Sequence, residues 1–146
     1  MGRDRAADAL GAREGSSLTA FLDTNVLIRH LTGDPPEMAA RATAVLAGPG
    51  PLLLADLIVA ECVYVLESFY EVPAERVAEV MRAAIALPSI ETVDPDSLLR
   101  ALALYEVGLD FAEAYLVAQA ETSGVGEVVS FDRAIARVGT VAVREP

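Results

Sequence analysis

The chain has 146 residues, of which 53% are hydrophobic and 5% aromatic. This is the size of one domain, and folding at this size buries roughly two-thirds of the surface that the unfolded chain exposes. The net charge is −11, from 22 acidic and 11 basic residues, and every basic residue is arginine. So negative a chain argues against non-specific binding of nucleic acid through a broad basic face.

Neither a secretory signal nor a membrane span is predicted. Residues 1–17 are polar and charged without an apolar centre, and we interpret them as a mobile arm before the domain of residues 18–146. The most hydrophobic stretch, residues 51–66, contains two acids and is too short to cross a bilayer. Cys62 is the single cysteine and cannot form an internal disulfide, so we expect a cytoplasmic protein.

From residue 19 onward, short β-type runs alternate with helical runs. This alternation predicts an α/β fold with a parallel sheet and helices on both of its faces. The predicted strands cover residues 19–23, 51–54, 90–93, 127–131 and 140–143. The predicted helices cover residues 25–31, 36–47, 56–70, 73–85, 95–107, 110–122 and 132–138, with Asp56 and Asp94 as N-caps.

Four acids fall at or near the carboxyl ends of predicted strands. Asp23 ends the first strand, and Glu61 lies early in the helix after the second. Glu113 lies in the first turn of the helix begun by Asp110, and Asp132 directly follows the strand at residues 127–131. Because ligands of open parallel sheets bind beyond the carboxyl ends of the strands, we expect these carboxylates to meet at one edge.

Gathering four carboxylates has an energetic cost that points to a function. Two carboxylates about 4 Å apart repel each other by roughly 4 kcal/mol at an effective dielectric constant near 20. The cluster must therefore take up protons or bind cations. Oxygen ligands without histidine or cysteine suit Mg²⁺ or Mn²⁺ better than zinc. One or two such ions serve the cleavage of phosphodiesters, in which they activate water and stabilise the leaving oxygen.

Each acid also has a structural interpretation. Asp23, Asp110 and Asp132 stand where a helix N-cap is needed, and Asp110 with Glu113 is close to a capping box. Glu61 lies within the apolar run LIVAECVYVL, where an unpaired carboxylate is costly to bury, although a partner such as an arginine would also explain it. No single acid decides between structure and catalysis. Their joint placement favours a metal site.

The chain resembles the PIN-domain family, and in particular the VapC-type toxins, in four segments. These are FLDTNVLIRHL (21–31), AECVYVLESFY (60–70), LDFAEAYLVAQA (109–120) and VVSFDRAI (128–135). The resemblance covers about residues 19–143. It implies a three-layer α/β/α sandwich around a central parallel sheet of four to five strands. It further implies a Mg²⁺- or Mn²⁺-dependent endoribonuclease, the toxin of a toxin–antitoxin pair, usually a homodimer that a cognate antitoxin inhibits.

The resemblance also assigns roles to individual residues. By position, the metal ligands are Asp23, Glu61, Glu113 and Asp132, while Thr24, Asn25 and Ser130 orient ligands or water. The family usually has Asp-x-x-Asp-Ala in its third segment, whereas this chain has DFAEA at residues 110–114. Asp110 is therefore a further candidate ligand.

The arginines and the net charge suggest partners. Arg29 and Arg133 lie within two helical turns of proposed site acids, so they are candidates for phosphate contact as well as for solvated surface positions. Together with the family resemblance, the net charge of −11 predicts that an antitoxin supplies basic side chains to the acidic pocket.

Two other functions compete with a PIN ribonuclease. The first is a degenerate PIN fold that acts only as a protein- or RNA-binding module. The second is a metal-dependent phosphatase of another α/β family, because FLDTN resembles the start of haloacid-dehalogenase-type phosphatases and of receiver domains. The phosphatases use Asp-x-Asp-x-Thr, whereas here Asn25 and Leu27 occupy the third and fifth positions. Receivers need a lysine, and the sequence has none.

Overall fold

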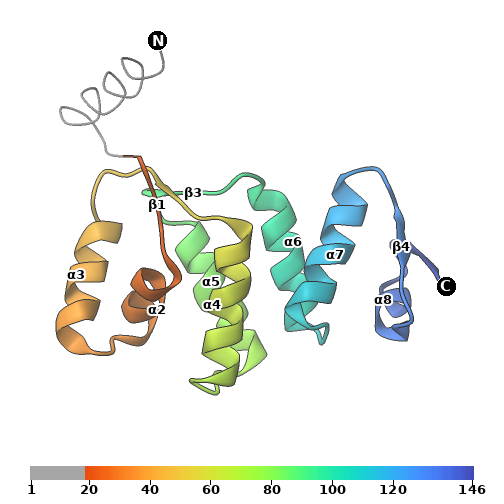
Figure 1. Cartoon of the computed structure of the whole chain (residues 1–146), viewed down its shortest axis with the longest axis horizontal. Helices are drawn as coiled ribbons and strands as arrows, with labels where there is room; N and C mark the ends of the chain where they lie inside the picture. Colours follow the sequence, from red (N-terminus) through yellow and green to blue (C-terminus); the bar gives the residue numbers. More distant parts are fainter. Residues whose placement is uncertain (1–18) are drawn as a thin grey trace, which may run out of the picture.

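The computed structural model describes residues 19–146, and the mobile arm predicted over residues 1–17 lies outside the described residues. Figure 1 shows how the helices and strands are arranged. In chain order they are β1 (Ala20–Phe21), α2 (Thr24–Thr32), α3 (Pro36–Leu46), β2 (Leu52–Leu53), α4 (Asp56–Ser68), α5 (Ala74–Ile85), β3 (Ile90–Glu91), α6 (Pro95–Glu106), α7 (Phe111–Thr122), β4 (Glu127–Val129), α8 (Arg133–Val138) and β5 (Ala142–Arg144). Over residues 19–146, no helix is both long enough and apolar enough to span a membrane.

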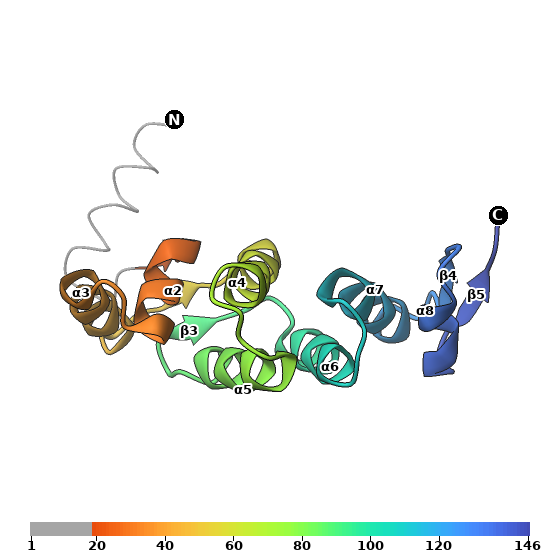
Figure 2. The ribbon, with the colours of Figure 1, turned by 90° about the horizontal axis from the view of Figure 1, so that it is seen from below.

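Three parallel strands in the order β1-β2-β3 form the first sheet. Ala20 pairs with Leu52, and Leu52 pairs in turn with Ile90. The ladder continues past β1, because the N–H of Leu22 donates to the C=O of Leu53 at 2.9 Å. Helices α2 to α5 lie around these strands in Figures 1 and 2, and Leu22, Leu52 and Ile90 are buried in the core.

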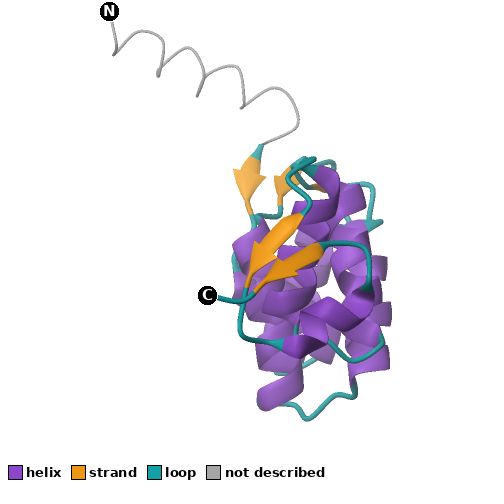
Figure 3. Cartoon of the chain, turned by 90° about the vertical axis from the view of Figure 1, so that its right-hand side faces the viewer, coloured by secondary structure: helices purple, strands orange, loops and turns teal. Residues whose placement is uncertain are grey.

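Two further parallel strands, β4 and β5, form a separate sheet at the other end of the molecule. Glu127 pairs with Ala142, and α8 connects the two strands. In Figures 1 and 2 this β4–α8–β5 unit lies beyond α7, far from the first sheet. Figure 3, seen from the side of the C-terminal strands, likewise shows two distinct groups of strands. Val128, Ile135 and Val141 anchor the unit to the core.

Helices α6 and α7 pack against each other between the two sheets (Figure 2). Their polar links are specific: Arg100 donates to both carboxylate oxygens of Glu121, and Gln119 Nε2 donates to Ser97 Oγ at 2.8 Å. Leu98 and Leu102 of α6 are fully buried. Burying a leucine side chain stabilises a fold by about 1.5–3 kcal/mol, so this helical pair is firmly held.

The predicted α/β class, with helices around a parallel sheet, is confirmed. The number of strands in one sheet is smaller than the predicted four to five, because the five strands of residues 19–146 divide into groups of three and two. The predicted strand at residues 19–23 shortens to two residues in β1. Asp94 caps α6 as predicted, whereas Ala55 takes the N-cap position of α4 that was predicted for Asp56.

Gly50 offers a test of how the first sheet is built. The residue has φ 63°, and a Cβ added to it would lie 2.6 Å from the carbonyl oxygen of Ser89. That oxygen accepts the N–H of Leu52 in the β2–β3 ladder. Gly33 has φ 71° with no atom within 4 Å of an added Cβ, so it is a matched control.

Gly50→Ala should therefore destabilise the protein more than Gly33→Ala does. Both substitutions carry about 1 kcal/mol of left-handed backbone strain. The clash with Ser89 should add about 1–3 kcal/mol at Gly50 alone, measured by urea unfolding. Equal losses at the two positions would contradict the described contact between the Gly50 turn and β3.

Candidate active site

Asp23 and Glu61 form one carboxylate group where β1 ends. Asp23 stands at the N-cap position of α2, yet its side chain accepts no capping hydrogen bond. The hydroxyl of the buried Thr24 donates to Glu61 Oε2 at 2.7 Å and so links the start of α2 to α4. Both carboxylate side chains are on exposed residues, which leaves their oxygens open to a ligand.

The pKa of the buried Cys62 thiol responds to both of these acids. Burial, followed by the negative charges of Glu61 and Asp23, raises the pKa of Cys62 to about 12. The thiol therefore stays protonated and unreactive at neutral pH. One group feels both charges, so Asp23 and Glu61 lie within electrostatic reach of each other.

Glu61 is exposed, contrary to the expectation that it lies among apolar side chains. Leu57 and Tyr64, at helical spacing on either side of it, are 77% and 69% exposed. One face of α4 is therefore uncovered, which is why an acid is tolerated in an apolar run. Its partner is the Thr24 hydroxyl rather than an arginine.

Asp110, Glu113 and Asp132 form a second carboxylate group at the start of α7 and α8. Asp110 Oδ1 caps α7 by accepting the N–H of Glu113 at 2.8 Å. Asp132 Oδ1 caps α8 by accepting the N–H of Ala134 at 2.8 Å, and Ser130 Oγ accepts the N–H of Asp132. Both aspartates thus play the capping role that the sequence allowed, while each keeps a second carboxylate oxygen.

The side chains of Glu113 and Asp132 shift each other's pKa in opposite directions. A hydrogen bond to Asp132, then burial and the charges of Asp110 and Asp132, raise the pKa of Glu113 to about 7. The same hydrogen bond lowers the pKa of Asp132. Repulsion between two adjacent carboxylates is relieved here by keeping one of them protonated.

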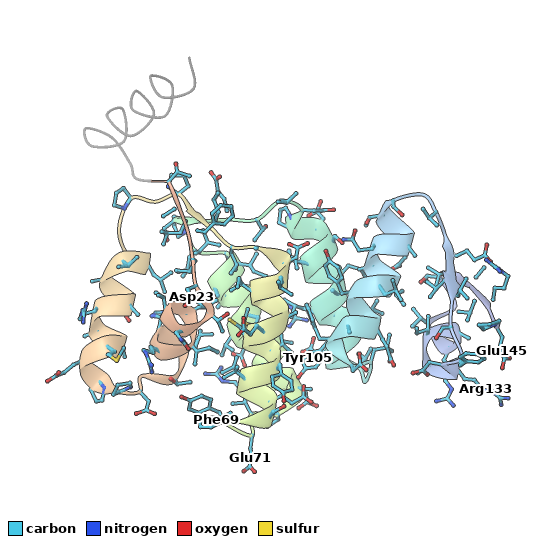
Figure 4. The ribbon with its side chains drawn as sticks, in the orientation of Figure 1. Asp23, Phe69, Glu71, Tyr105, Arg133 and Glu145 are labelled. Atoms are coloured by element: carbon cyan, nitrogen blue, oxygen red, sulfur yellow. The ribbon has the colours of Figure 1, made fainter. Side chains whose placement is uncertain are left out.

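The two groups do not meet within one chain. Among residues 19–146, no set of three or more histidine, cysteine or acidic side chains is placed to hold a metal ion. In Figure 4, Asp23 and Arg133, the residue after Asp132, are labelled at widely separated points of the molecule. The expectation that four carboxylates meet at one sheet edge is therefore corrected to two separate groups, because β4 is not paired with β1.

The other predicted site residues lie on different elements of the structure. Asn25 is exposed beside Asp23, and Ser130 lies beside Asp132. Arg29 lines a groove between α2 and α3 together with Arg41, and its Nη1 reaches the C=O of Asp34. Arg133 is exposed at the start of α8.

A polar contact joins α4 and α7 that was not predicted from the sequence. The Tyr115 hydroxyl donates to Asp56 Oδ2 at 2.5 Å, and this bond together with burial raises the pKa of Tyr115 to about 12. The other oxygen, Asp56 Oδ1, is buried without a partner. No local pattern predicts a bond between residues 59 positions apart, so Asp56 was predicted only as an N-cap.

The raised pKa of Glu113 predicts how Glu113→Gln changes stability with pH. Because the pKa of Glu113 is raised from 4.5 to about 7, the folded chain holds a proton that the unfolded chain releases between these values. Stability contributed by this group is present below the lower value and is lost as the pH rises through the upper one. Without metal, Glu113→Gln should be neutral at pH 4.5 and stabilising by up to about 1 kcal/mol at pH 8, after allowance for solvent screening.

Urea unfolding at the two pH values measures this effect. Glu79→Gln is the control, since Glu79 lies in an exposed ion pair with Arg76 on α5, away from both groups. A gain of equal size at both pH values, or an equal gain in the control, would contradict the raised pKa of Glu113.

The region of the chain that matches a known family contains both carboxylate groups. The PIN domain family model matches residues 20–141, from β1 to the residue before β5. A search of curated proteins found no match. The family match includes all the segments that carry Asp23, Glu61, Glu113 and Asp132, and it covers most of the chain. The chain therefore belongs to the PIN domain family, a family of metal-dependent nucleases.

Proposed function

We propose that this protein is a Mg²⁺- or Mn²⁺-dependent endoribonuclease whose site unites the two carboxylate groups. Family membership supports a nuclease role. The observation that carries the proposal is that Asp23 makes no capping bond, while the pKa of Glu113 is raised beside Asp132. Both groups are thus arranged to gain from a positive charge.

The chemistry of the donors fits a hard divalent cation. Every candidate ligand is a carboxylate oxygen, supported by hydroxyl and amide oxygens of Thr24, Ser130 and Asn25, which is the set that Mg²⁺ and Mn²⁺ prefer. Among the described residues, neither group alone brings three acidic, histidine or cysteine side chains into the arrangement of a metal site. Bound ions would supply Lewis-acid stabilisation of charge on phosphate and lower the pKa of water.

Within this proposal each residue has a role that follows from its contacts. Asp23, Glu113 and Asp132 hold cations, and Asp110, whose Oδ1 caps α7, has a second carboxylate oxygen with which to assist. Glu61, oriented by the Thr24 hydroxyl, is a ligand or the base that positions the attacking water. Glutamate at position 113 is one methylene longer than the aspartate usual in the family, so its carboxylate reaches further from α7.

The competing functions differ in what they predict. A PIN fold that only binds protein or RNA would leave the carboxylates without effect on RNA cleavage. A phosphatase of another α/β family has no support from the family match, which is to PIN domains over residues 20–141.

We further propose that the protein is the toxin of a toxin–antitoxin pair, works as a homodimer and is inhibited by a basic segment of its antitoxin. The net charge of −11 and the exposed acids of both groups support such a partner. An arginine or lysine placed among these carboxylates would be held by Coulomb attraction and would compete with the metal. Arg29 and Arg133 remain the candidates for contact with RNA phosphate.

Asp23→Asn and Glu113→Gln should each lower cleavage of an RNA pool in Mn²⁺ by on the order of 100-fold or more. Loss of a residue that only supports a metal ligand typically costs about 10–100-fold in activity, and loss of the ligand itself should cost more. Both variants should fold, since each removes a repulsive charge. The measurement is the initial rate of cleavage, with circular dichroism as the check on folding.

Glu79→Gln, on the surface of α5, is the matched control and should keep the wild-type rate. A chelator should abolish cleavage by the wild type and by this control. Asp23→Asn with unchanged activity would refute the proposed site.

A basic peptide should inhibit cleavage in proportion to its charge. An arginine-rich helix should protect RNA at low salt and lose this effect as salt screens the attraction. The measurement is the rate of cleavage against peptide concentration at about 50 mM and 500 mM salt. Inhibition by a glutamate-rich peptide of the same length, or none by the basic one, would contradict an acid-lined binding surface.

A further inference from the structure

A groove runs between α2 and α3, which lie side by side in Figures 1 and 2. Its volume is about 250 Å³. The side chains that line it include Asn25, Val26, Arg29, Met38, Arg41 and Val45. Within each helix these residues follow one another at spacings of three or four, or lie next to each other, so each helix contributes one face to the groove.

Two arginines of this groove have no acidic partner among residues 19–146. Four other arginines of the same residues pair with glutamates, namely Arg76, Arg82, Arg100 and Arg144. Arg29 and Arg41 form no such pair, although the chain has 22 acidic residues and 11 basic ones. Arg29 Nη1 makes a long contact of 3.5 Å to the C=O of Asp34, and Arg29 Nε is buried without a hydrogen-bond partner. Since a buried donor without an acceptor is costly, an anionic group in this groove would be bound favourably.

The remaining surface of the groove is apolar. Met38 is 43% exposed and Val45 is 51% exposed, while Val26 is half-buried. A small inorganic anion would contact the arginines and leave this apolar surface in water. A ligand that combines an anion with a flat apolar face would use both parts. Benzene fills a cavity of about 150 Å³, so about 250 Å³ has room for a ring system of the size of a nucleobase.

The groove begins beside one of the two carboxylate groups. Asn25 lines it and lies two residues after Asp23. Arg29 lies six residues after Asp23, which corresponds to about 9 Å along a helix axis. An RNA strand with one phosphate at Asp23 could therefore place a neighbouring nucleotide in the groove.

We propose that the α2–α3 groove binds a single unpaired nucleotide of the RNA substrate, next to the bond that is cut. Arg29 and Arg41 bind its phosphate, because a guanidinium offers a fork of donors that matches phosphate oxygens. The apolar wall of Met38 and Val45 covers one face of the base, which an unpaired nucleotide exposes. This inference rests on the proposed function for the identity of the substrate, but the binding can be measured without cleavage.

RNA fits this groove better than an acidic peptide does. An RNA strand carries a phosphate at every nucleotide, so one strand can place a phosphate at the cation-binding acids and another between Arg29 and Arg41. Each of these phosphates has a flat base nearby. The side chains of aspartate and glutamate have no apolar ring beside the carboxylate, and they would leave Met38 and Val45 in contact with water. The combination of arginines and an apolar wall therefore favours a nucleotide.

Binding of a fluorescent single-stranded RNA in EDTA tests the phosphate contacts. Arg41 is exposed, so Arg41→Gln should fold. The variant should bind RNA more weakly by on the order of 10-fold, because a hydrogen bond to a charged group is lost. The slope of log affinity against log salt should also fall by roughly 0.7, which is the value for one phosphate contact on a single strand.

Arg76→Gln on α5 is the matched control for this experiment. It removes the same charge from an exposed ion pair with Glu79 and should keep the wild-type affinity and salt slope. Equal losses in the two variants would overturn the proposal, because they would reflect the net charge of the chain rather than a contact in the groove. Absence of RNA binding by the wild type would overturn it as well.

An RNA of the same length without bases tests the apolar wall. Val45→Ser changes no charge and should weaken binding of the intact RNA by about 3–10-fold, because it removes apolar contact with a base. Binding of the abasic RNA should stay unchanged in this variant. Val93→Ser, at a position that is 94% exposed after β3, is the control and should change neither. If Val45→Ser weakens both RNAs equally, the wall does not contact a base and the proposal fails.

Cleavage rates in Mn²⁺ separate this proposal from the proposed function. Arg41→Gln should raise KM with little change in kcat, since the groove holds a nucleotide away from the reacting atoms. A wild type that binds RNA as described but does not cut it would refute the proposed function and leave the groove standing. A wild type that cuts RNA, with KM and binding unchanged in Arg41→Gln, would refute the groove alone.

A glutamate-rich peptide distinguishes the other possible occupant. The expected result is that the wild type binds this peptide more weakly than it binds the single-stranded RNA. Tighter binding of the peptide than of the RNA, lost in Arg41→Gln, would assign the groove to an acidic peptide and overturn the proposal.

Discussion

Two carboxylates within hydrogen-bonding reach of each other, Glu113 and Asp132, cannot both stay ionised without a compensating positive charge. A hydrogen bond to Asp132, followed by burial, raises the pKa of Glu113 to about 7, so Glu113 takes up a proton more readily than an isolated glutamate does. Asp23 and Glu61 form the other group, where the Thr24 hydroxyl gives a single hydrogen bond to Glu61. Under the proposed function, both groups would bind a divalent cation more favourably than the same acids paired to arginine would. The proposed chemistry depends on this need for a compensating positive charge.

The arrangement of the strands keeps the two carboxylate groups apart. The first sheet ends at β1 and the second at β4, and each open edge adjoins one carboxylate group. Strands of two or three residues contribute few backbone hydrogen bonds, so the helical pair α6–α7, with its buried leucines and its Arg100–Glu121 ion pair, determines where the C-terminal strands lie.

Local patterns in the sequence were sufficient for much of this. The caps Asp94, Asp110 and Asp132 are predicted from neighbouring residues, and the structure contains them. What local patterns could not supply is the pairing of distant strands. Asp23 and Asp132 follow strands whose adjacency depends on contacts more than 100 residues apart in the chain, and periodicity carries no information on such contacts. For the same reason Glu61 was expected in an apolar environment, although its face of α4 is open.

Titration with Mn²⁺ by calorimetry tests most directly whether the two carboxylate groups make one site. If they do, Asp23→Asn and Asp132→Asn should each remove the same binding event, and the double variant should lose no more than either single variant. If the groups bind metal independently, each single variant will retain the binding that belongs to the other group. Losses of Mn²⁺ binding that add up in this way would contradict a single site formed by both carboxylate groups.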